Sequence, residues 1–143
     1  MSISSSEVRI VQWQDEAPAL SAIRKAVFIE EQHVPEELEW DEFDPVSIHA
    51  LAVNPFGAPV GTARLLPDGH IGRMAVLKAW RGRGIGSAML QRLLDEARHR
   101  GVSEVILNAQ ITAAAFYAKF GFQTSGNEFM EAGIPHVKMF LKL

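Results

Sequence analysis

Two kinds of hydrophobic pattern divide the chain into predicted strands and helices. Short turns rich in proline and glycine, at residues 54–57 and 67–69, join three of the strands and predict an antiparallel meander. We expect an irregular connection over residues 128–135. Strands are expected where apolar residues alternate with polar ones or run on without interruption: 8–13, 47–53, 60–66, 69–77, 104–108, a strand that begins at 122, and 136–141.

Apolar residues recur at helical spacing in the first part of the chain. This helix should open at Glu16, with Asp15 as its cap, and fade near residues 32–33, just before a proline that disfavours helical angles. A shorter helix is expected over residues 113–120, with Thr112 as its cap.

A third helix, beginning after Gly84 and ending around residues 98–100, organises the fold. It follows the strand at 69–77 and precedes the fully apolar strand at 104–108, so it should form a right-handed crossover between two parallel strands. The predicted fold class is therefore α/β with a mixed sheet: an antiparallel N-terminal meander, then parallel strands around one crossover helix.

Composition narrows the class of protein. A length of 143 residues predicts a single domain with a sizeable core, which we take to span 1–143. A net charge of −3 argues against binding to nucleic acid through bulk charge. The chain has no cysteine, which excludes a disulfide scaffold, a cysteine nucleophile and a thiolate metal site. No apolar run is as long as a membrane span, and residues 1–7 lack an apolar signal core, so a cytoplasmic location is expected.

The stretch Arg81-Gly82-Arg83-Gly84-Ile85-Gly86 links the central strand to the crossover helix. Glycines let the backbone approach a ligand, the first amides of a helix are unpaired, and arginines complement a pyrophosphate, so the stretch is a candidate phosphate site. It fits neither the dinucleotide fingerprint nor the P-loop. A tight turn with its arginines in solvent is the alternative.

The spacing Arg-x-x-Gly-x-Gly, within residues 72–86, resembles the cofactor motif of the GCN5-related N-acetyltransferase (GNAT) superfamily. Residues 115–122 (Ala-Phe-Tyr-Ala-Lys-Phe-Gly-Phe) are similar to a later motif of that family, about 30 residues further on. Two motifs in the right order are more specific than either alone. The likeness extends from Val8 to the end, and residues 28–35 and 134–136 resemble the ElaA-like branch.

This resemblance implies transfer of an acyl group, usually acetyl, from acetyl-CoA to an amine, by direct attack in a ternary complex and without a metal. The glycine loop would hold the pyrophosphate, and the strand before it would present backbone groups to the pantetheine arm if it splays from the strand at 104–108. The implied cofactor-binding residues are Met74, Ala75, Val76, Arg81, Gly82, Arg83, Gly84, Ile85, Gly86, Asn108 and Tyr117.

Tyr117, the only tyrosine, occupies the family position that donates a proton to the leaving thiolate. A phenol has a pKa near 10 and a thiol near 8.5, so the transfer is slightly uphill, although a hydrogen bond to the thiolate would still help. A core tyrosine with a satisfied hydroxyl is the alternative. Asn108 either bonds a pantetheine amide or simply ends its strand.

An attacking amine must lose a proton, and no spacing selects the base. Glu31 and His136 stand slightly ahead because they lie in the stretches that resemble the ElaA-like branch. The acidic segment 36–44 is either a solvated short helix or loop with a few apolar anchors, or a substrate-facing lip that attracts a cationic acceptor. The full set of candidate bases is Glu30, Glu31, His33, Glu36, His49, His70 and His136.

Two other classes stay open: an acyl-CoA-binding module without turnover, and a phosphate-binding or nucleotide-binding domain unrelated to coenzyme A. The acceptor could be a small amine or a peptide N-terminus, and a homodimer through the C-terminal strands is plausible. No nucleic acid or membrane partner is expected.

Overall fold

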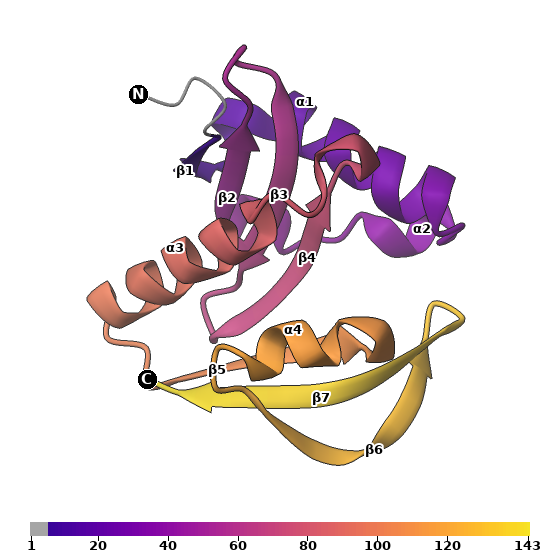
Figure 1. Cartoon of the computed structure of the whole chain (residues 1–143), viewed down its shortest axis with the longest axis vertical. Helices are drawn as coiled ribbons and strands as arrows, with labels where there is room; N and C mark the ends of the chain where they lie inside the picture. Colours follow the sequence, from indigo (N-terminus) through magenta and orange to yellow (C-terminus); the bar gives the residue numbers. More distant parts are fainter. Residues whose placement is uncertain (1–5) are drawn as a thin grey trace.

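A seven-stranded sheet in the order β1-β2-β3-β4-β5-β7-β6 runs through the molecule (Figure 1). The computed structural model describes residues 6–143, so the serine-rich start of the chain lies outside the described residues. Every neighbouring pair of strands is antiparallel except β4 and β5, which confirms the predicted mixed sheet. The strands are β1 Glu7–Gln12, β2 Ile48–Val53, β3 Pro59–Leu65, β4 His70–Val76, β5 Glu104–Gln110, β6 Gln123–Glu131 and β7 Ile134–Lys142.

Helices cover both faces of the sheet and make two apolar cores. On one face, α1 buries Leu20 and Ile23 against β2 and β4. On the other, α3 buries Met89 and Leu93 against the sheet in the larger core. The longer helices are α1 Trp13–Arg24, continued by the π-helix η1 Lys25–Glu31, and α3 Ile85–His99; α2 Glu36–Glu39 and α4 Ala114–Ala118 are short, as are the 3₁₀ turns η2 Asp44–Val46, η3 Lys78–Trp80 and η4 Ile111–Ala113.

The first helix begins earlier than the sequence predicts. It starts at Trp13, and its cap residue Gln12 makes no side-chain cap bond, so Asp15 is not the cap. Glu16 leaves helical angles (φ −134°), and Pro18 then falls in the first turn of the part that follows, where a proline is tolerated. The end agrees with expectation, because η1 stops at Glu31 and residues 32–33 leave the helix.

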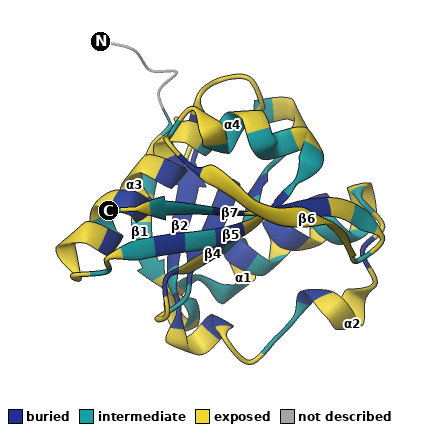
Figure 2. Ribbon diagram, turned by 90° about the horizontal axis from the view of Figure 1, so that it is seen from below, coloured by how far each residue is buried: buried dark blue, intermediate teal, exposed yellow. Residues whose placement is uncertain are grey.

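The segment predicted to be an irregular connection is a hairpin. β6 and β7 pair up to Glu131 and Ile134, and the two residues between them, Ala132 and Gly133, both have positive φ (51° and 77°). Such a pair of angles belongs to a tight hairpin turn, which usually carries Asn-Gly or Asp-Gly, so an alanine hid the signal. Figure 2 shows β6 exposed along its length at the edge of the sheet.

The crossover from β4 through α3 to β5 sets the shape of the functional region. The two parallel strands pair only at His70 with Ile106 and at Ile71 with Leu107. Beyond these residues β4 stays with β3 while β5 turns to β7 (Figure 1). Within residues 6–143, no helix is both long and apolar enough to span a bilayer.

Candidate active site

A cleft of about 290 Å³ lies where β4 runs into α3. Its walls include Val76 at the end of β4, the glycine loop and Phe116 of α4. Gly82 and Gly84 have φ values of 77° and 80°, a conformation that other residues adopt only with strain. These glycines turn the chain so that α3 begins at the cleft.

The N-terminus of α3 faces this cleft with free donors. Its first helical hydrogen bond runs from Ala88 to the carbonyl of Gly84, so the amides of residues 85–87 have no carbonyl partner within the helix. These donors lie at the positive end of the helix dipole, where an anion is stabilised. The predicted phosphate loop thus has the backbone geometry that an anion needs.

The open edge of β4 leads directly into the cleft. The Leu77 amide donates to Val60 of β3 at 2.9 Å, and backbone groups alternate along a strand, so the Val76 amide and carbonyl point away from β3. The Val76 carbonyl accepts a bond from Arg81 Nε at 2.8 Å. This is the splayed strand that the sequence could only postulate.

The two loop arginines are both engaged. Arg81 binds both carboxylate oxygens of Glu31, at 2.7 and 2.6 Å, across 50 positions of sequence. The Arg83 guanidinium lies 4.6 Å from the centre of the Trp80 ring. The hydrogen bond from Arg81 lowers the pKa of Glu31, which weakens this carboxylate as a base.

Tyr117 reaches β4 from α4. Its hydroxyl lies 3.7 Å from Met74 Sδ, a weak contact, and its ring packs edge-on against Phe116 and Phe122. Burial raises the pKa of Tyr117 to about 12, so the phenol stays protonated at neutral pH. The predicted proton donor therefore lies beside the predicted pantetheine strand.

A second polar cluster lies on the other side of the opening. Asn108, the first β5 residue beyond the pairing with β4, donates to Glu131 Oε1 at 3.3 Å, and Glu131 Oε2 lies 3.6 Å from His136 Nε2. His136 Nδ1 is 2.6 Å from the Ile134 carbonyl. A carbonyl only accepts, so in the neutral ring Nδ1 carries the proton and Nε2 is left as an acceptor.

One hydrogen bond joins this cluster to the first helix. Gln110 pairs with His136 in the sheet, and its Nε2 donates to Gln32 Oε1 at 2.9 Å. Gln32 is the residue that caps the end of η1, directly after Glu31. The segment whose Glu31 binds Arg81 therefore also contacts β5, the neighbour of the strand that carries His136, although nothing in the sequence pointed to the glutamine pair.

The other histidines named as bases have other surroundings. His49 is fully buried, its Nε2 donates to the Asp44 carbonyl at 2.9 Å, and burial lowers its pKa. His70 pairs with Asp68 at the start of β4, about 20 Å of strand away from the cleft. Glu30 and His33 lie on either side of the Glu31 and Gln32 contacts, and Glu36 opens α2.

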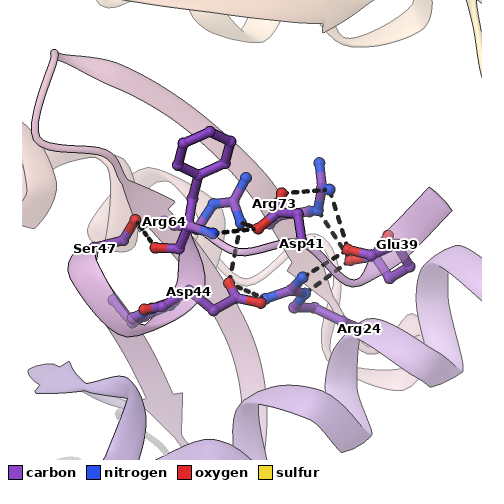
Figure 3. A network of polar contacts seen from close by, with 9 residues as sticks. Arg24, Glu39, Asp41, Asp44, Ser47, Arg64 and Arg73 are labelled. Carbon is purple, nitrogen blue, oxygen red and sulfur yellow. Dashed lines mark hydrogen bonds and ion pairs between the residues drawn. The ribbon is translucent and has the colours of Figure 1, made fainter. Parts of the chain in front are cut away.

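Half of the acidic segment is paired with arginines instead of facing solvent. Asp44 bonds Arg24 at 2.7 Å and Arg64 at 3.0 Å, and Glu39 bonds Arg24 at 2.7 Å. Figure 3 shows these side chains in one network, which Arg73 of β4 joins through Glu39 and Asp41. The charges of these acids are neutralised by arginines, which neither interpretation of segment 36–44 anticipated. The first interpretation holds for the rest of the segment, because residues 36–39 form a short helix and Glu36, Glu37 and Glu42 are exposed.

A metal site requires a close group of histidine or carboxylate side chains. Within residues 6–143, no three histidine or carboxylate side chains are arranged so that they could hold a metal ion.

Comparison with known proteins gives a consistent result. A family model described as an acetyltransferase (GNAT) domain matches residues 12–143. The uncharacterized N-acetyltransferase YjcF of Bacillus subtilis is 41% identical over 121 residues, which cover 82% of this chain and 86% of that protein. Protein ElaA of Escherichia coli is 30% identical over 147 residues, covering 91% and 95%. An acyl-CoA N-acyltransferase from Pseudomonas aeruginosa superposes with a TM-score of 0.85 at 31% identity, covering 95% of this chain and 99% of that one.

Proposed function

Because this chain belongs to the GNAT acetyltransferase family, we propose that it transfers an acetyl group from acetyl-CoA to an amine as a single domain. One observation carries the proposal: β4 leaves β5 and runs, with its edge open, into the anion-binding start of α3. A long ligand with a phosphate part and an extended arm fits such a path.

The residues of this path divide between the parts of the cofactor. The glycine loop and the amides of residues 85–87 suit the pyrophosphate, and the backbone of Met74, Ala75 and Val76 suits the pantetheine arm. Asn108 uses its Nδ2 on Glu131, so its Oδ1 is left to accept from an arm amide. Acetyl-CoA supplies the thioester and its leaving thiolate.

Tyr117 holds the proton for that thiolate. With a pKa of about 12 against 8.5 for a free thiol, complete transfer to a solvated thiolate is uphill by roughly 5 kcal/mol. The hydroxyl therefore acts first as a hydrogen-bond donor, and it gives up its proton only as the thiolate is itself desolvated beside Met74.

His136 takes the proton from the amine. Its Nε2 is the free acceptor of the ring, and Glu131 at 3.6 Å stabilises the charged ring once it forms. Glu31 is the second candidate, but both of its oxygens are bound by Arg81. The amine then attacks the thioester directly in a ternary complex, and no thiol can carry the acyl group because the chain has no cysteine.

Binding and turnover test the proposal separately. Thermal-shift titration with acetyl-CoA, against ATP and NAD as controls, should show a shift with acetyl-CoA alone; saturation at about 100 times the dissociation constant adds roughly 2.7 kcal/mol. Free-thiol release across a panel of small amines and peptides should then identify the acceptor. Binding without release for any amine would favour an acyl-CoA sensor, and an equal shift with ATP would favour a nucleotide site.

Single substitutions test cofactor binding and turnover separately. Arg83→Ala should weaken the acetyl-CoA shift, because its guanidinium lies beside the cleft on Trp80, whereas Arg98→Ala, a matched change at the far end of α3, should not. His136→Gln should keep the shift and lose turnover.

A further inference from the structure

Arg73 lies in the middle of β4 with a backbone φ of 51°, in the left-handed region that side chains disfavour. The pairing with β3 shifts at this point: Arg64 faces Gly72, whereas Thr62 faces Ala75. Two steps along β3 thus match three along β4, which defines a β-bulge. A glycine would adopt this φ freely, so an arginine here needs other contacts to hold it.

The bulge decides which backbone groups face the open edge of β4. Before it, the His70 carbonyl faces β3 and accepts a hydrogen bond at 2.8 Å from the residue that follows that strand. Strict alternation would turn Met74 and Val76 to β3 as well. Instead the Leu77 amide donates to β3 at 2.9 Å, so the backbone groups of Met74 and Val76 face the gap that opens between β4 and β5. The same shift brings the Met74 thioether to the Tyr117 hydroxyl.

Three contacts hold the Arg73 side chain, all from the acidic segment. Its Nη2 donates to the Glu39 carbonyl at 3.1 Å and to Asp41 Oδ2 at 3.2 Å. Its Nε lies 3.1 Å from Glu39 Oε2. Glu39 is only 3% exposed, so its contacts with Arg73 are shielded from water and salt, whereas the Asp41 side chain is 25% exposed.

The clamp is itself fixed to the rest of the fold. Arg24, fully buried in α1, bonds both the carboxylate and the carbonyl of Glu39, at 2.7 and 3.0 Å. Its guanidinium lies between the rings of Trp13 and Trp40, 5.6 and 5.1 Å from their centres. Arg64 of β3 bonds Asp41 at 2.8 Å. Figure 3 shows Arg73 joined to both Glu39 and Asp41 in this network, so the bulge is tied to α1 and β3 through segment 39–44.

We propose that Arg73 is a positioning residue, which acts through Glu39 to hold the β4 bulge and so aims the Met74 and Val76 backbone at the acyl thioester. The inference rests on the proposed acyl transfer. It assigns a role to the acidic segment that neither interpretation of its sequence gave: the segment holds the strand that binds the acyl donor.

Kinetics of two substitutions test the role. Arg73→Ala removes the clamp and keeps a side chain that disfavours the bulge, so kcat should fall about 10- to 100-fold while KM for acetyl-CoA stays within about threefold. Arg73→Gly also removes the clamp but adopts positive φ freely, so it should recover at least about threefold of the lost kcat. Arg98→Ala, the exposed control, should match the wild type. A residue that only stabilises the fold would lower the melting temperature and leave kcat of the folded enzyme unchanged.

Amide hydrogen exchange on the unliganded protein tests the bulge without any turnover. In Arg73→Ala the Leu77 amide should lose protection as its bond to Val60 is broken, and in Arg73→Gly it should keep most of it. Unchanged Leu77 protection in Arg73→Ala would overturn the positioning role, as would lost protection with unchanged kcat. If the wild type transferred no acyl group from any acyl-CoA, the proposed function would be wrong. The exchange data would still show whether Arg73 holds the bulge.

Discussion

Tyr117 should titrate far above an ordinary tyrosine, and the chain allows this to be measured on one group. Burial beside Met74 and Phe122 raises its pKa to about 12, against about 10 for an exposed phenol. Two pH units correspond to roughly 2.7 kcal/mol in favour of the neutral form. Because the folded value is the higher one, this stability is present below about pH 10 and is lost as the pH rises toward 12.

The assay is an ultraviolet titration of the phenolate. Tyr117 is the only tyrosine, so the signal belongs to it alone. The folded protein should show a midpoint near 12 and the urea-unfolded chain one near 10. Between about pH 9 and 11 the wild type should lose roughly 1 kcal/mol more stability than Tyr117→Phe, measured by denaturant titration. A folded midpoint near 10 would refute the burial on which this reasoning rests.

The same substitution separates a proton donor from a core tyrosine. Tyr117→Phe keeps the ring and removes only the hydroxyl, whose single contact is a weak one to sulfur. Stability at neutral pH should therefore change by less than about 1 kcal/mol. The kcat for acyl transfer should fall about 100-fold, with KM for acetyl-CoA nearly unchanged, because the donor acts on the leaving group. An unchanged kcat would mean that Tyr117 is a core residue and not the proton donor.

Four further substitutions follow from the site. Gly84→Val should weaken acetyl-CoA binding at least about tenfold in thermal-shift titration, through backbone strain at φ 80°, since no atom lies within 4 Å of its added Cβ. Glu31→Gln frees Arg81 and should lower KM for acetyl-CoA up to about fivefold; a tenfold loss of kcat would identify Glu31 as the base instead. His136→Gln should cost about 100-fold in kcat while the acetyl-CoA thermal shift is kept. Arg24→Met should destabilise the protein by about 3 kcal/mol in denaturant titration, because it removes the nearest cation from the buried Glu39 and Asp44, which then keep only Arg73 and Arg64.

The strand, glycine loop and helix around Arg81 were predictable because their signals are local. Alternation marks β4, two glycines mark a turn with positive φ, and the spacing of Ile85, Met89 and Leu93 marks the buried face of α3. A short apolar strand after the helix was enough to predict the parallel crossover.

Other elements were missed because a local rule was broken. The hairpin turn at Ala132 and Gly133 uses an alanine where asparagine or aspartate is usual, so the segment gave no turn signal. The caps expected at Asp15 and Thr112 are absent, since α1 starts earlier and α4 starts later than these residues require.

The sequence alone determined the order and type of the elements around the cofactor motif, because each follows from the hydrophobic periodicity of a few neighbouring side chains. Tertiary structure decided the chemistry of the site. It chose which acids meet Arg24, Arg64 and Arg73, it placed Glu131 beside His136, and it opened β4 by ending its pairing with β5. Such choices depend on groups that are far apart in the chain and meet only after the sheet has formed, so no local pattern records them.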